Sequence, residues 1–197
     1  EAPTIVITAN ILDRTSRPAD NITAEAITLA GALADTARIV RVENTAVDNL
    51  PFATTLVIDT SESMAGSPIA AAKAAARLFV ENINENDIVS IVTFSNTAQI
   101  VQPFTNDRET LTSAIDSIQA AGRTALYDAA VLALETAASA PVPRQAIIML
   151  SDGAEFGGAS TALREEALEL ATMRGVSFYM IGLGFGTDRT YLQELAD

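Results

Sequence analysis

Short apolar runs alternate with helix-like stretches from Pro51 onward, and this alternation constrains the fold more than any other feature. Residues 55–59 and 146–150 are short, almost wholly apolar runs, as expected of parallel strands that are buried on both faces. Between them, residues 68–83 carry apolar side chains at helical spacing. The pattern predicts an α/β fold: a doubly wound, mostly parallel, Rossmann-like sheet with helices on both faces.

The same alternation places the remaining elements. We expect further strands at 88–94, 98–101 and 176–183, and helices at 107–118, 124–138, 160–174 and 188–196. Gln99, Gln102 and Pro103 mark 98–101 as an edge strand, because proline cannot donate a hydrogen bond to a strand ladder. Ser67 is the expected N-cap of the first helix, with Pro68 at its first position.

Residues 1–50 have a different pattern. Alternating apolar segments at 4–9, 26–29 and 38–42 predict a few short strands, with turns at 13–20 and 31–35. Two or three strands rarely bury a core by themselves. We therefore expect two parts, a β-rich segment over 1–50 and an α/β domain over 51–197.

The missing residue types exclude several kinds of chemistry. The chain has no Cys and no His, which excludes disulfides, thiol nucleophiles, Ser-His-Asp catalysis and the common transition-metal sites. Carboxylates, hydroxyls and hard cations such as Mg²⁺ remain.

Charge and hydropathy narrow the class of partner. The net charge is −13, so phosphate backbones would be repelled and we expect no nucleic-acid partner. No apolar run approaches the roughly 18 residues that a membrane-spanning helix needs, so we expect no membrane span in this chain.

Two of the predicted strands end in carboxylates. Asp59 closes one strand and Asp152 follows another; in a doubly wound sheet, ligands bind beyond the carboxyl ends of the strands, where the strand order reverses. Ser61 and Ser63 follow Asp59 on its loop, and Thr124 lies on a third loop. Two carboxylates and three hydroxyls suit an octahedral hard cation and leave positions for water or an incoming ligand.

These residues resemble a known motif set. Asp59-Thr60-Ser61-Glu62-Ser63 resembles the Asp-x-Ser-x-Ser motif of von Willebrand factor type A domains. Residues 122–128 are similar to the family's threonine loop, and 151–153 to its second aspartate motif. The resemblance covers about 51–197. It implies a metal-ion-dependent adhesion site formed by Asp59, Ser61, Ser63, Thr124 and Asp152.

The resemblance also implies a cofactor and a partner. The expected metal is Mg²⁺, with Mn²⁺ and Ca²⁺ as the other candidates, and a protein ligand that offers an Asp or Glu often completes the metal shell. Arg123, beside Thr124, is the nearest basic residue by sequence; we hypothesise that it forks onto the ligand at the rim, and a simply solvated side chain is the alternative.

The resemblance has one departure. The chain stops inside what resembles the family's last helix, before the final edge strand, so we expect that strand to be missing, and regulation by a helix shift is in doubt. Residues 1–50 loosely resemble a β-rich lead-in of some bacterial extracellular members, which can be half of a β-sandwich completed beyond residue 197. An extracellular or bacterial envelope location is the expectation, and a cytoplasmic one stays open.

The leading interpretation is a non-enzymatic, metal-dependent protein-interaction or adhesion module. One alternative is a Mg²⁺-dependent phosphoryl-transfer enzyme on a Rossmann-like sheet. The phosphatases of that kind need a second Asp two positions after the first, where this chain has Ser61, and the only Lys, Lys73, lies inside a helix. The other alternative is an intracellular partner of an ATPase, as some members of the family are.

Overall fold

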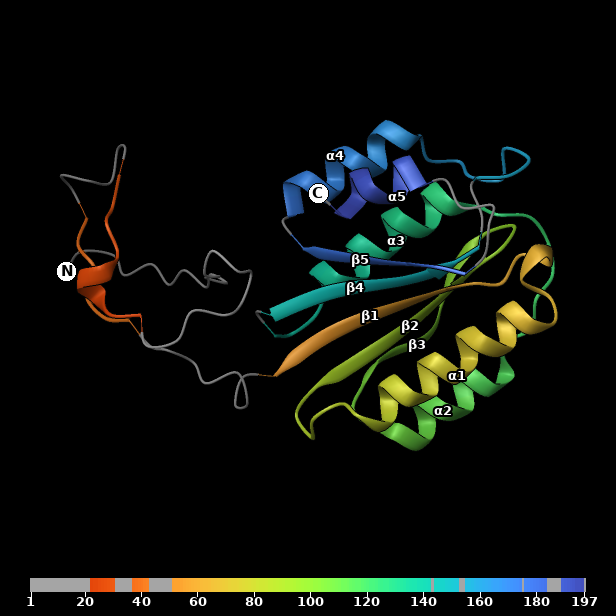
Figure 1. The fold of residues 1–197 in the computed structure, drawn as a ribbon, viewed down its shortest axis with the longest axis horizontal. Helices are drawn as coiled ribbons and strands as arrows, with labels where there is room; N and C mark the ends of the chain where they lie inside the picture. Colours follow the sequence, from red (N-terminus) through yellow and green to blue (C-terminus); the bar gives the residue numbers. More distant parts are fainter. Residues whose placement is uncertain are drawn as a thin grey trace. The chain divides into compact units, whose positions relative to one another are not determined.

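The computed structural model describes residues 22–30, 37–42, 51–142, 144–152, 155–174, 176–183 and 189–196. The chain divides into two compact units, Glu1–Leu50 and Pro51–Asp197. The second unit contains the sheet and its helices (Figure 1). The strands are β1 (Phe52–Asp59), β2 (Ile88–Phe94), β3 (Ala98–Thr105), β4 (Arg144–Ser151) and β5 (Ser177–Gly182). The helices are α1 (Ser67–Glu81), α2 (Arg108–Ser117), α3 (Leu126–Ala138), α4 (Arg164–Arg174) and α5 (Arg189–Ala196).

The five strands form one sheet in the order β3-β2-β1-β4-β5. β1 pairs in parallel with β2 and β4, and β4 pairs in parallel with β5. β3 pairs antiparallel with β2 and forms one edge of the sheet. An edge strand has a neighbour on one side only, so it tolerates Pro103, which has no N–H to donate. The predicted α/β fold with a mostly parallel sheet is confirmed.

The strand order reverses at β1. The chain passes from β1 to β2 and β3 on one side, and then returns to β4 and β5 on the other. The last register pair between the two central strands joins Ile58 to Leu150, so Asp59 and Ser151 come next, at the same edge of the sheet. This edge is the place where doubly wound folds bind their ligands.

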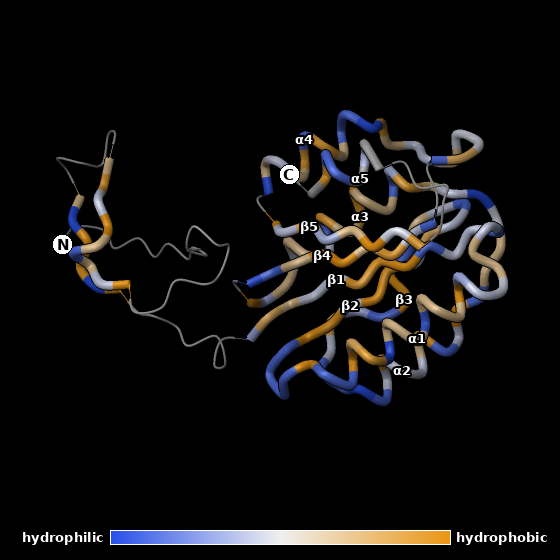
Figure 2. The backbone as a smooth tube through the Cα atoms, in the orientation of Figure 1, coloured by the Kyte–Doolittle hydropathy of each residue, from blue (hydrophilic) through white to orange (hydrophobic). Residues whose placement is uncertain are grey.

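Helices cover both faces of the sheet. α1 and α2 lie on one face, and α3, α4 and α5 lie on the other (Figure 1). Alternate residues of β1 pack into separate clusters: Val57 packs with α3, whereas Leu56 and Ile58 pack with α1 and α2. Figure 2 shows the hydrophobic colour concentrated along the strands, as burial on both faces requires.

Helix starts differ from the prediction by up to four residues; α3, for example, begins at Leu126 rather than at Thr124. Gly66, not Ser67, is the N-cap of α1, and its φ of 85° is a conformation that glycine adopts at little cost. α4 begins at Arg164 rather than at Ser160, because the Ser160 hydroxyl accepts hydrogen bonds from the start of α3 instead.

The prediction of strands in the N-terminal unit is wrong where it can be compared. Residues 22–30 and 37–42 contain one 3₁₀ helix, η1 (Ala24–Ala26), and neither 26–29 nor 38–42 is a strand. Val40 is 75% exposed, so the apolar alternation over 38–42 is not matched by burial. A strand needs a paired neighbour, and these two stretches do not supply one to each other. The predicted strand 4–9 and the turns 13–20 and 31–35 lie outside the described residues.

None of the helices in the described parts of the chain has the length and apolar composition that crossing a membrane requires.

The packing of the helices predicts the effect of two leucine substitutions. Leu134 on α3 is completely buried, whereas Leu78 on α1 is 62% exposed. Leu134→Ala should lower the free energy of unfolding by about 2–5 kcal/mol, because it removes buried methyl groups and leaves a cavity. Leu78→Ala should change it by less than about 0.5 kcal/mol. Urea denaturation followed by circular dichroism measures both, and equal losses would contradict the assigned helix faces.

Candidate metal centre

Asp59 is the last residue of β1 and is completely buried. One carboxylate oxygen, Oδ1, accepts a hydrogen bond from the Ser61 backbone N–H at 2.8 Å. The other, Oδ2, accepts from the Ser151 hydroxyl at 2.6 Å. Both oxygens are therefore held, and Asp59 joins the loop after β1 to the end of β4.

The environment of Asp59 makes its charge costly. Burial raises the pKa of the Asp59 carboxyl above its ordinary value; the hydrogen bonds from Ser151 and Ser61 oppose the shift, and the negative charge of Asp152 adds to it. A divalent cation beside the carboxylate would favour its ionised form and reverse this balance.

Ser61, Ser63 and Asp152 form a continuous chain of oxygen atoms. The 3₁₀ helix η3 (Glu62–Met64) turns the loop so that the two serine hydroxyls lie 3.1 Å apart. The Ser63 hydroxyl donates a hydrogen bond to Oδ1 of Asp152 at 2.9 Å, across from β4. The structure thus brings four of the five predicted metal residues together from two loops.

Thr124 lies on a third loop, which is tied to the first by backbone hydrogen bonds. The Ala121 N–H donates to the Thr60 carbonyl at 2.7 Å, and the Glu62 N–H donates to the Gly122 carbonyl at 2.9 Å. Thr124 itself is buried and forms an isolated bridge with Phe156. It precedes α3 by two residues and is not its N-cap, which is Ala125. Thr124 therefore does not cap α3.

The threonine loop depends on a contact that has no local sequence signal. Gly122 has a φ of 93°, and a Cβ atom there would come within 3.0 Å of the Asn96 side chain. The Asn96 carbonyl oxygen, Oδ1, accepts from the Arg123 backbone N–H at 3.0 Å. Asn96 lies in the turn between β2 and β3, so only the fold brings it here.

Arg123 and Phe156 lie beside Thr124 at the rim. The Arg123 guanidinium donates to the Gly157 carbonyl at 3.3 Å, so it rests on the connection between β4 and α4. The Phe156 side chain is 70% exposed, so it does not pack into the core.

The donor set fits a hard divalent cation. Ligands in an octahedral Mg²⁺ shell at about 2.1 Å from the metal lie about 3.0 Å from their neighbours. The spacings of 3.1 Å and 2.9 Å from Ser61 through Ser63 to Asp152 are close to that value. In the described part of the chain, no group of three or more His, Cys, Asp or Glu residues gathers as an alternative metal site. A cation here would be held mainly by hydroxyls, with two carboxylates for charge.

Comparison with known proteins identifies what this domain resembles. A family model described as von Willebrand factor type A domain matches residues 54–155. A UPF0353 protein of Mycolicibacterium paratuberculosis is 32% identical over 154 residues, which cover 67% of this chain and 45% of that protein. An uncharacterized protein of Synechocystis, sll0103, is 28% identical over 153 residues, which cover 75% of this chain and 36% of that protein. The chain thus spans less than half the length of these two curated relatives.

Solved structures share the fold at lower identity. A von Willebrand factor type A protein from Catenulispora acidiphila has a TM-score of 0.66 at 19% identity, covering 75% of this chain and 36% of that one. A D319A mutant of the PilB minor pilin from Streptococcus sanguinis has a TM-score of 0.62 at 16% identity, covering 77% and 55%.

The raised pKa of Asp59 predicts that the metal-free protein is stabilised when this charge is removed. Because the folded pKa lies above the unfolded one, the contribution of Asp59 to stability is highest below the unfolded pKa. It falls as the pH rises through the folded value. At neutral pH, Asp59→Asn should raise the melting temperature without metal, since Asn can keep partners at Ser61 and Ser151.

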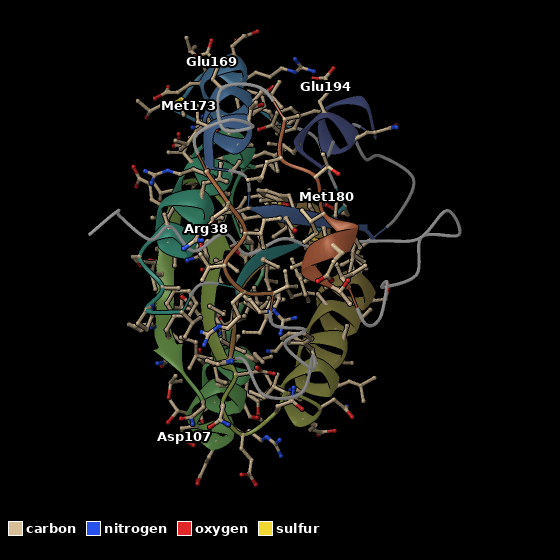
Figure 3. All side chains as sticks on the ribbon, turned by 90° about the vertical axis from the view of Figure 1, so that its left-hand side faces the viewer. Arg38, Asp107, Glu169, Met173, Met180 and Glu194 are labelled. Carbon is tan, nitrogen blue, oxygen red and sulfur yellow. The ribbon has the colours of Figure 1, made fainter. Side chains whose placement is uncertain are left out.

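Asp107, labelled in Figure 3, supplies a control whose pKa shift has the opposite sign. It is the N-cap of α2, and hydrogen bonds from Thr110 and Glu109 lower the pKa of its carboxyl. The Asp107 carboxylate therefore stabilises the fold at pH values above its unfolded pKa, and this stabilisation is lost as the pH falls through its folded pKa. Asp107→Asn should therefore lower the melting temperature at neutral pH. If both variants shifted the melting temperature in the same direction in EDTA, the assigned environment of Asp59 would be wrong.

Proposed function

The chain belongs to the von Willebrand factor type A family, and from this premise we propose that its α/β domain is a metal-dependent protein-interaction module rather than an enzyme. The observation that carries the proposal is the chain of oxygens from Ser61 through Ser63 to Asp152, next to the buried Asp59. Hydroxyls and carboxylates at that spacing suit a hard cation.

Each residue has a distinct role in the proposal. Ser61, Ser63, Asp152 and Thr124 would hold Mg²⁺, with Mn²⁺ or Ca²⁺ as substitutes. When bound, the cation supplies an open coordination position for a carboxylate of the partner. Asp59 supplies negative charge, and its bonds to the Ser61 N–H and the Ser151 hydroxyl keep the loop after β1 in one geometry. These anchors lie at strand ends, so little ordering is left for binding to impose.

The partner in this proposal is a protein that offers an Asp or Glu side chain. Such a partner meets a chain of net charge −13, so its capture depends on local features at the rim rather than on the overall field. Arg123 supplies a cation beside Thr124, and the exposed Phe156 supplies an apolar contact next to it.

Two other functions have less support. For phosphoryl transfer, the position of the second Asp is taken by Ser61, which contacts Ser63. The Lys73 ammonium donates to the backbone carbonyls of Asp116 and Ile118 at the end of α2, so it is engaged in holding α1 to α2. Service to an ATPase inside the cell has no specific observation in its favour. The likeness to a pilin supports, as part of the proposal, a place in the envelope or outside the cell.

Metal binding is testable through thermal stability. A metal that binds only the folded state should stabilise it by about 2.7 kcal/mol at 100 times its dissociation constant. Thr124→Ala should reduce the rise in melting temperature that Mg²⁺ gives over EDTA. Thr136→Ala, which removes a buried hydroxyl bonded to Leu132 within α3, should leave that rise unchanged. No effect of Mg²⁺ on the unaltered chain would refute the metal site.

The partner assignment is testable through the salt dependence of association. A protein captured in Mg²⁺ and released by EDTA should associate faster as NaCl is raised, because added salt screens repulsion between two acidic partners. Arg123→Ala should weaken capture, whereas Arg144→Ala, at the opposite end of β4, should not. Surface plasmon resonance measures the association rate at each salt concentration and the affinity of each variant. Association that slows steeply with salt, together with normal binding by Arg123→Ala, would rule out the acidic ligand.

A further inference from the structure

We propose that Glu155 is a positioning residue that fixes the threonine loop at the metal centre by capping α3 from another part of the chain. This inference rests on the proposed function, since it assigns a role in that same site. Glu155 belongs to no motif in the sequence, and it lies three residues after Asp152.

The start of α3 lacks a cap of its own. The residue at its N-cap position is Ala125, which has no side-chain acceptor. The N–H groups of the first turn, which have no acceptor within the helix, instead find partners from distant segments. The Leu126 N–H donates to Oε2 of Glu155 at 2.7 Å, and the Tyr127 and Asp128 N–H groups donate to the Ser160 hydroxyl oxygen at 3.1 Å and 3.2 Å.

Glu155 and Ser160 form one unit. The Ser160 N–H donates to Oε1 of Glu155 at 2.8 Å, and the Ser160 hydroxyl donates to Oε2 at 2.8 Å. The Glu155 carboxylate thus accepts three hydrogen bonds and faces the positive end of the α3 dipole, where a negative charge is favourable. Because these bonds use both of its oxygens, Glu155 acts on the site through the loop and not as a metal ligand.

The segment that carries this cap is fixed to the threonine loop at one end and to the first turn of α3 at the other. The Phe156 N–H donates to the Thr124 carbonyl at 3.2 Å. At the far end, the Asp128 carboxylate accepts from the Thr161 and Ala162 N–H groups at 2.9 Å and 2.8 Å. The position of Thr124 is therefore coupled to the chain that leaves β4 just after Asp152.

Glu155 supplies the third of three connections among the site loops. The loop after β1 meets β4 through Ser63 and Asp152, and it meets the threonine loop through the Gly122 carbonyl. The connection between the threonine loop and the β4 segment runs through Glu155 and Ser160. Without it, the bond between the Phe156 N–H and the Thr124 carbonyl would remain, but the first turn of α3 would lose its acceptors from the β4 segment.

The test measures Mn²⁺ affinity by electron paramagnetic resonance in the full chain. Glu155→Gln keeps an oxygen for the Leu126 N–H but removes the charge and the second acceptor for Ser160. It should weaken Mn²⁺ binding by about 10- to 100-fold, as loss of a group that orients ligands does elsewhere. Asp107→Asn removes a carboxylate cap from α2 and should leave the affinity unchanged. Thr105, two residues before Asp107, pairs with Val89 near the start of β2, at the edge away from the site.

A double variant separates positioning from general destabilisation. If Glu155 acts through Thr124, then Glu155→Gln should weaken Mn²⁺ binding little further once Thr124→Ala is present. An unchanged affinity of a folded Glu155→Gln variant would overturn the inference while leaving the proposed function intact. So would equal losses with and without Thr124→Ala, or an equal loss in Asp107→Asn. If the unaltered chain bound no Mn²⁺, that result would refute the proposed function, and the inference that rests on it would also be wrong.

Discussion

The buried carboxylate of Asp59 is the constraint on which the rest of the site depends. A charge at the end of a central strand is tolerated only if each oxygen has a donor, and here the donors are the Ser61 N–H and the Ser151 hydroxyl. Because those two donors belong to different strand ends, satisfying Asp59 also sets the geometry of two loops. With the two loops in this geometry, the Ser63 hydroxyl donates a hydrogen bond to Asp152.

This arrangement exchanges stability for binding. Burial raises the pKa of Asp59, so the ionised carboxylate that would favour a cation also weakens the metal-free fold. The serine hydroxyls moderate the cost, because they solvate the acids without adding charge. The oxygens are thus already positioned for a cation, which in turn would bind a partner carboxylate, as we propose.

The α/β fold supplies the rigidity that such a site needs. Alternate residues of β1 pack into cores on opposite faces of the sheet, so the strand end that carries Asp59 has little freedom to move. The threonine loop is held by further polar contacts: the Asn96 side chain packs against Gly122, and Glu155 provides a cap for α3. The site therefore combines a core-anchored half with a half that is anchored by hydrogen bonds.

The sequence by itself determined the layer architecture, because the length and polarity of each apolar run decide between strand and helix. It also placed Asp59 and Asp152 at strand ends, since a buried run must stop where polar residues begin. It failed for 26–29 and 38–42, where alternation without a paired neighbour does not make a strand. Only the tertiary structure decided the roles of Asn96, Ser151, Glu155 and Ser160. Their partners are distant in sequence, and a hydrogen bond between distant residues exists only once the fold has brought them within reach.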